Sequence, residues 1–202
     1  QAYVRTLVDV EIALARAEAF VGVIPATAAE QIAAVTADKI DVAALTKGTL
    51  RSGFPIIALV QELRKQVSAD AAPYIHWGAT TQDIMDTASV LQLRGAIQIL
   101  SKLIRETAGH LAVLAEKHRS TVLAGRTHSQ QALPITFGLK VAGWLAPLLR
   151  HAERLAEIQP RLLVVQFGGA AGTLAALGGS GLAVMQALGN ELKLGTPAMP
   201  WH

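Results

Sequence analysis

The feature that most constrains the fold is residues 84–123, a stretch without proline in which apolar side chains recur at helical spacing. One apolar stripe comprises Val90, Leu93, Ile97, Leu100, Ile104, Ala108, Leu111 and Ala115. A second, shorter stripe comprises Ile84, Ala88, Leu91, Gly95 and Ile99. At about 1.5 Å per residue, the stretch predicts a helix of roughly 60 Å. Two stripes indicate burial on two sides, so this helix belongs inside a bundle.

A second long helix is predicted to begin at Pro134, because proline suits the first position of a helix, and to end at Pro160. The polar residues 125–133 would then join two antiparallel helices as a loop. The predicted fold is therefore all-α, an elongated antiparallel bundle of long helices. The chain supplies too few other long helices to cover this pair, so we expect oligomerisation.

Shorter helices are predicted at both ends of the chain, over residues 1–20 and 182–194. We divide the chain into an N-terminal helical domain, residues 1–78, and a central long-helix domain, residues 79–202. The chain opens inside an amphipathic pattern and closes on Pro200-Trp201-His202, which ends no recognisable element. We therefore expect both domains to be partial and the chain to be truncated before a C-terminal part.

Composition excludes several classes of protein. There is no cysteine, which rules out disulfides and thiolate metal sites. The net charge is only +3 and no basic run occurs, so we expect no nucleic-acid partner. Without a leader or an apolar run of roughly 20 residues, we expect a cytoplasmic protein with no membrane partner. No His-x-x-x-His or acidic triad occurs, so we also expect no metal.

Three segments carry clustered polar residues or glycines: Thr80-Thr81-Gln82-Asp83, residues 125–131, and residues 166–173. Thr80 and Asp83 have the spacing of a capping box and could serve only to begin a helix. The second segment could be a capped connector or an anion site at a helix start. The third could be a tight turn, or a place where backbone N–H groups approach an anion.

The order and spacing of these segments closely resemble the fumarase/aspartase superfamily. The segment from His76 to Ala88 resembles the first signature region, and Gly125-Arg126-Thr127-His128-Ser129-Gln130 resembles the Thr-His-x-Gln region. The resemblance implies a homotetramer whose active sites combine segments of three subunits. It also implies β-elimination, or the reverse addition, without a cofactor. A carbanion beside a carboxylate would be stabilised as an aci-carboxylate by aimed hydrogen-bond donors.

Within the superfamily, residues 77–83 and 166–173 are most similar to the bacterial 3-carboxy-cis,cis-muconate cycloisomerases, which close a tricarboxylate diene to a lactone. This implies 3-carboxy-cis,cis-muconate as the small tricarboxylate substrate and the protocatechuate branch of the β-ketoadipate pathway. One alternative is an adenylosuccinate- or argininosuccinate-lyase-like elimination that releases fumarate. Another is an inactive helical scaffold. The superfamily's third signature, whose serine is the base, lies beyond His202, so we expect this chain alone to be inactive.

The resemblance also implies roles for individual residues. His128 is the candidate general acid or base, or it orients a substrate carboxylate. The candidate substrate-binding residues are Arg126, Thr127, Ser129, Gln130, Thr80, Thr81, Gln82 and His76. For Arg126 a structural ion pair stays open as the alternative. For His76 the alternative is a hydrogen-bonded loop histidine.

Overall fold

The computed structural model describes residues 2–201. The described residues form two compact units, and each unit is described here by itself. The first unit combines Gln1–Leu93 with Pro160–His202, and the second comprises Arg94–Gln159. The structure is mostly helical, which confirms the predicted all-α class. The proposed division into partial domains 1–78 and 79–202 stays a prediction.

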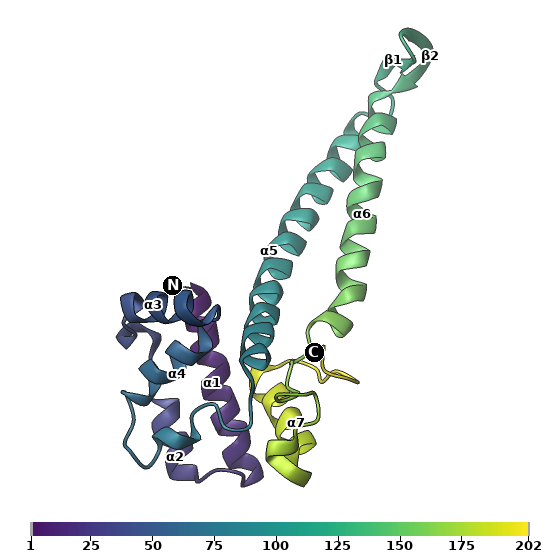
Figure 1. The fold of residues 1–202 in the computed structure, drawn as a ribbon. Helices are drawn as coiled ribbons and strands as arrows, with labels where there is room; N and C mark the ends of the chain where they lie inside the picture. Colours follow the sequence, from purple (N-terminus) through teal and green to yellow (C-terminus); the bar gives the residue numbers. More distant parts are fainter. Residues whose placement is uncertain (1, 202) are drawn as a thin grey trace. The chain divides into compact units, whose positions relative to one another are not determined.

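The first unit is built around α1 (Ala2–Val21), which packs against α2 (Ala26–Ala33) and α7 (Gly181–Leu192) (Figure 1). It also contains α3 (Val42–Ser52), which packs against α4 (Ile56–Arg64). Three short 3-10 helices complete it: η1 (Ala37–Lys39), η2 (Ala72–Tyr74) and η3 (Ala175–Ser180). Its core holds fully buried leucines of α1 and α4, among them Leu7, Leu14, Leu59 and Leu63. Burying each such side chain stabilises the fold by about 2 kcal/mol.

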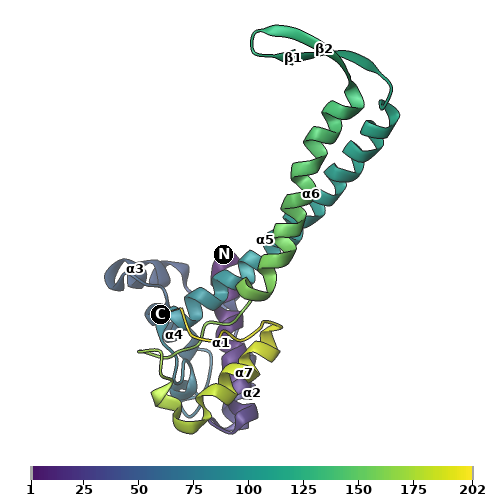
Figure 2. The same ribbon diagram turned by 90° about the vertical axis from the view of Figure 1, so that its right-hand side faces the viewer.

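The second unit holds most of two long helices, which run in opposite directions (Figures 1 and 2). They are α5 (Thr81–Lys117) and α6 (Phe137–Leu162). The long helix and its antiparallel partner were both predicted. Several apolar side chains of α5 stay exposed in this chain, including Ile99 at 63% and Leu103 at 52%.

The connection between α5 and α6 was predicted as a polar loop, and this prediction was wrong. The connection is a β-hairpin of β1 (Val122–Thr127) and β2 (Gln130–Thr136). The strands are antiparallel, with a register shift between Ala124 and Arg126. Gly125 lies at this irregularity, where an added Cβ would come within 2.6 Å of the Leu133 carbonyl oxygen. Glycine is therefore required by close backbone approach.

The predicted start of the second helix at Pro134 was also wrong. Pro134 lies in β2 opposite Ala124, and α6 begins at Phe137. The hydroxyl of Thr136 accepts a hydrogen bond from the N–H of Leu139 at 3.1 Å, so Thr136 supplies the side-chain cap. A two-stranded hairpin has only edge strands, where a proline without an N–H is tolerated.

Pro160 does not end α6, which continues to Leu162. Beyond it, Val164 forms an isolated parallel bridge with Gly195. The predicted terminal helices are confirmed, with α1 over Ala2–Val21 and α7 over Gly181–Leu192. Among residues 2–201, no helix is both long enough and apolar enough to cross a membrane.

Candidate active site

A hollow of about 410 Å³ lies at the N-terminal end of α5 in the first unit. It is lined by Phe54, Thr80, Thr81, Gln82, Met85, Asp86 and Ala170. The three candidate donors of the first segment therefore border one cavity. Backbone N–H groups in the first turn of a helix have no partner within the helix, and this suits the end of α5 to anionic groups. Phe54 and Met85 add an apolar wall for a carbon skeleton.

Gln82 is oriented by its neighbour in this hollow. Its side-chain amide donates to a carboxylate oxygen of Asp86 at 3.1 Å. The two residues are one helical turn apart, so their side chains lie on one face. One amide proton of Gln82 is thus committed to Asp86, and the second proton and the carbonyl oxygen are left for another partner.

The carboxylate of Asp83 joins two segments that are far apart in the sequence. One oxygen accepts a hydrogen bond from the N–H of Gly168 at 2.8 Å. The other accepts from the N–H groups of Gly169 at 3.0 Å and Thr80 at 2.9 Å. Asp83 is buried, with only 1% of its surface exposed. The contact with Thr80 is half of the predicted capping box, and the two glycine contacts were not foreseen.

These contacts bear on the two alternatives for the glycine-rich segment, residues 166–173. Its first two glycine N–H groups do approach an anion, but that anion is a side chain of the same protein. Gly169 has φ +67°, a conformation that disfavours other residues. An added Cβ on Gly168 would lie 2.8 Å from Cβ of Pro200. These glycines therefore serve a tight turn that closes on a buried carboxylate.

Thr87 makes a second buried contact with the same segment, one turn further along α5. Its hydroxyl donates to the carbonyl oxygen of Gln166 and accepts from the N–H of Gln166, both at 2.9 Å. The side chain of Gln166 in turn accepts from the N–H of Trp201 at 2.7 Å. Residues 166–169 are thus attached to α5 at two points.

His76 lies against α1 and is not among the residues that line the hollow. Its Nδ1 is 2.7 Å from a carboxylate oxygen of Glu11, and its side chain is 18% exposed. Burial alone would lower the pKa of His76, but the hydrogen bond and the negative charge of Glu11 outweigh it, with a smaller contribution from Asp83. The pKa is therefore raised above its usual value.

Glu11 and Glu18 were missed by sequence reasoning. Both are buried on α1, and neither carboxylate oxygen of Glu18 has a hydrogen-bond partner among the described residues. Burial, and then the nearby charge of Glu11, raises the pKa of Glu18 to about 9. The available signal was spacing, because both glutamates follow buried leucines, Leu7 and Leu14, at the helical interval of four.

The remaining candidate residues lie together on the hairpin of the second unit. Arg126, Thr127, His128, Ser129 and Gln130 are all exposed. The amide of Gln130 donates to the hydroxyl of Thr127 at 3.1 Å across the hairpin end. His128 and Ser129 form the turn itself, and Ser129 has φ +56°. Within residues 2–201, Arg126 forms no ion pair.

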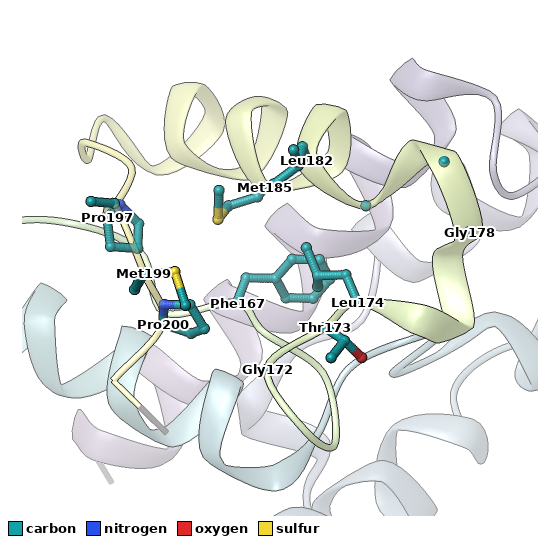
Figure 3. A pocket seen from close by; sticks show the side chains of 13 residues that line it. Phe167, Gly172, Thr173, Leu174, Gly178, Leu182, Met185, Pro197, Met199 and Pro200 are labelled. Carbon is teal, nitrogen blue, oxygen red and sulfur yellow. The ribbon is translucent and has the colours of Figure 1, made fainter.

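A second hollow of about 390 Å³ lies between α7 and residues 197–200 (Figure 3). Phe167, Leu174 and Met185 line it, together with Met199 and two prolines. No charged side chain belongs to its lining, and none of the candidate site residues borders it. Across the described chain, no three His, Asp or Glu side chains gather as metal ligands would.

The sequence profile of the family described as "Lyase" matches residues 1–202. The chain belongs to this lyase family. A 3-carboxy-cis,cis-muconate cycloisomerase of Pseudomonas aeruginosa is 51% identical over 200 residues, which are 97% of this chain and 44% of that protein. The match confirms the resemblance to the fumarase/aspartase superfamily that its signature segments indicated.

Two solved lyase structures share the fold. The 3-carboxy-cis,cis-muconate lactonizing enzyme of Pseudomonas putida has a TM-score of 0.95 and 46% identity, covering 98% of this chain and 46% of that chain. The fumarate lyase of Mesorhizobium sp. BNC1 has a TM-score of 0.94 and 48% identity, covering 100% of this chain and 48% of that chain. The chain therefore spans about half the length of the relatives it matches.

Proposed function

We propose that the protein carrying this chain is a cofactor-independent cycloisomerase that closes 3-carboxy-cis,cis-muconate to 4-carboxymuconolactone. The observation that carries the proposal is the 51% identity, over nearly the whole chain, to a relative named for this reaction. The reaction is an isomerisation, so atoms balance without a second substrate. It would belong to the protocatechuate branch of the β-ketoadipate pathway.

In the proposed mechanism, one substrate carboxylate oxygen adds to a carbon of a double bond. The displaced electron pair moves toward a neighbouring carboxylate, which becomes an aci-carboxylate, and a proton then adds to the new sp³ carbon. Such a dianion is stabilised by donors that are already in position. Thr80, Thr81 and Gln82 border the hollow, and their hydroxyl and amide groups can donate hydrogen bonds there.

We assign the proton transfer, or the orientation of a substrate carboxylate, to His128. An imidazole titrates near neutral pH and can serve as acid or base. His128 lies exposed in the hairpin turn, where it is accessible to a ligand. Thr127, Ser129 and Gln130 would donate to carboxylate oxygens beside it, and Arg126 would offset the substrate's charge. A contact of His76 with substrate stays a prediction. The bond between its imidazole and Glu11 favours the alternative of a hydrogen-bonded loop histidine.

We further propose a homotetramer in which active sites combine segments of different subunits. Support comes from large apolar side chains left exposed on the long helices, including Leu100 at 49%, Leu139 at 61% and Trp144 at 48%. Large apolar side chains that stay exposed in one chain are often covered in an oligomer. Light scattering on the purified protein would test this, and a monomer at micromolar concentration would contradict it.

A second candidate is the elimination of fumarate from a succinyl-type substrate. It is favoured by the 48% identity to the structure named fumarate lyase. The two candidates are separated by an absorbance assay with each substrate in turn. Loss of 3-carboxy-cis,cis-muconate with formation of the lactone supports the cycloisomerase. Fumarate released from adenylosuccinate or argininosuccinate supports the lyase, and no turnover of any substrate supports an inactive scaffold.

A further inference from the structure

We propose that Asp83 is a positioning residue that sets the width of the hollow at the start of α5. This inference rests on the proposed function, because it assumes that the hollow receives a substrate carboxylate. Asp83 does not line the hollow itself. It holds together the two segments that do.

Asp83 links two segments that both line the hollow. Thr80, Thr81 and Gln82 line it at the start of α5, and Ala170 lines it from the glycine-rich segment; we call these two linings its first and second wall. The Asp83 carboxylate binds the backbone N–H of Thr80 in the first wall. It also binds the N–H of Gly169, the residue that precedes Ala170. Moving Asp83 would therefore change the separation of the two walls.

The link through Asp83 is strong and specific. Hydrogen bonds to an ionised carboxylate are roughly twice as strong as bonds between neutral groups. Three N–H groups converge on Asp83 at 2.8–3.0 Å inside the protein, where few waters compete. The left-handed conformation of Gly169 contributes to this convergence. An ordinary helix cap needs only the contact with Thr80.

Thr87 supplies a matched control for this link within the same unit. Thr87 is also buried on α5 and also binds the glycine-rich segment, through Gln166. Neither Thr87 nor Gln166 lines the hollow. Substitution of Thr87 should weaken packing without changing the distance between the walls.

The experiment compares Asp83→Asn with Thr87→Val in the full protein. The asparagine is isosteric, but it places an NH2 group against backbone N–H donors. We expect Asp83→Asn to lower kcat/KM about 100-fold, since misplacement by about 1 Å costs that much. We expect Thr87→Val to lower Tm at least as far while kcat/KM stays close to wild type.

A second variant with a longer carboxylate tests the proposal even if Asp83→Asn fails to fold. Asp83→Glu keeps the charge and the acceptors but moves them by one methylene. We expect it to fold and to lower kcat/KM more than tenfold, mainly through KM, because a misplaced donor wall weakens substrate binding. Hydrogen exchange at Gly168 and Gly169 should accelerate in both Asp83 variants.

Two outcomes overturn the inference, and they are distinguishable. If Asp83→Glu retains wild-type kcat/KM, or if Asp83→Asn and Thr87→Val lose activity in proportion to lost stability, Asp83 has only a structural role while the proposed function stands. If the wild-type protein turns over none of the substrates tested, the proposed function fails, and the positioning role fails with it.

Discussion

The two groups of candidate donors are held in very different ways. Thr80, Thr81 and Gln82 begin a helix whose first turn is attached to the buried carboxylate of Asp83. Thr127 and Gln130 close an exposed hairpin and bond to each other at 3.1 Å. The first group is oriented by contacts within its own unit. The second group would gain fixed partners only from a ligand or another copy of the chain.

This difference predicts whether a substitution should change mainly the stability or mainly the activity. Apart from Asp83, which we propose also shapes the hollow, changes in the buried region should alter stability first, because each contact there is shielded from water. Changes in the hairpin turn should alter activity first, because its exposed side chains contribute little to folding.

The largest expected effect is on activity, from His128→Ala. Loss of a general acid or base costs about 100- to 10,000-fold in rate. Because His128 is exposed in the turn, Tm should stay within about 1 °C, as expected for a surface substitution. The measurement is kcat/KM on 3-carboxy-cis,cis-muconate together with a thermal melt. His110→Ala, an exposed histidine on α5, is the control, and equal activity of the two variants would remove His128 from the site.

The next effect concerns pH and the buried region. The pKa of Glu18 is about 9 in the folded state and near 4.5 when unfolded, so within this range the folded state holds the extra proton. Stability should therefore fall as pH rises, by about 1 kcal/mol per pH unit. The raised pKa of His76 changes stability in the same direction. The stabilisation by protonated His76 is complete below the usual pKa of 6.5 and is lost as the pH rises through the folded pKa.

Glu18→Gln should remove most of this pH dependence, because an amide does not titrate. The measurement is the urea midpoint at several pH values between 5 and 8. Glu30→Gln, which changes an exposed glutamate on α2, should leave the slope intact. A slope in Glu18→Gln equal to that of wild type would show that Glu18 does not hold a proton in the folded state.

A matched pair of threonine substitutions gives the third effect. Thr87→Val leaves the N–H and carbonyl oxygen of Gln166 without their partner, which should cost about 2 kcal/mol in the free energy of unfolding. Thr127→Val makes the same change on the exposed hairpin and should cost less than about 0.5 kcal/mol. Urea unfolding measures both. Equal losses would mean that the hairpin is as tightly integrated as the buried region.

The smallest effect is expected from Ser129→Gly. Ser129 has φ +56°, where glycine is less strained by up to about 1 kcal/mol. The hairpin amides should therefore exchange a few-fold more slowly, while KM rises through loss of the hydroxyl. Ser120→Gly, on the segment between α5 and β1, is the comparison. Faster exchange in Ser129→Gly would show that the serine side chain, and not backbone strain, governs the turn.

Much of the fold could be predicted from periodicity. Apolar spacing over residues 84–123 predicted a long helix, and α5 covers Thr81–Lys117. The hairpin was missed because Pro134 also suits a helix start, and because the polar residues of the turn are common in loops. In the structure, the hydrogen bond from the N–H of Leu139 to the hydroxyl of Thr136 marks the start of α6.

The candidate site was predictable in part. The spacing of Thr80 and Asp83 correctly predicted a helix start with a backbone contact. The contacts of Asp83 with Gly168 and Gly169 join residues distant in sequence, and no local pattern encodes such a pair. The same holds for His76 and Glu11, whose pairing directs the imidazole toward α1.

The amino-acid order alone therefore determined the helical class, the long antiparallel pair and the membership of the lyase family, because periodicity and signature segments are local properties. The tertiary structure decided which polar groups are buried, which are paired and which border the hollow. Burial and pairing depend on distances between remote segments, and those distances arise only when the core packs. Asp83 shows both at once, since its spacing predicted a cap and the packed core also brought its buried carboxylate within hydrogen-bond distance of Gly169.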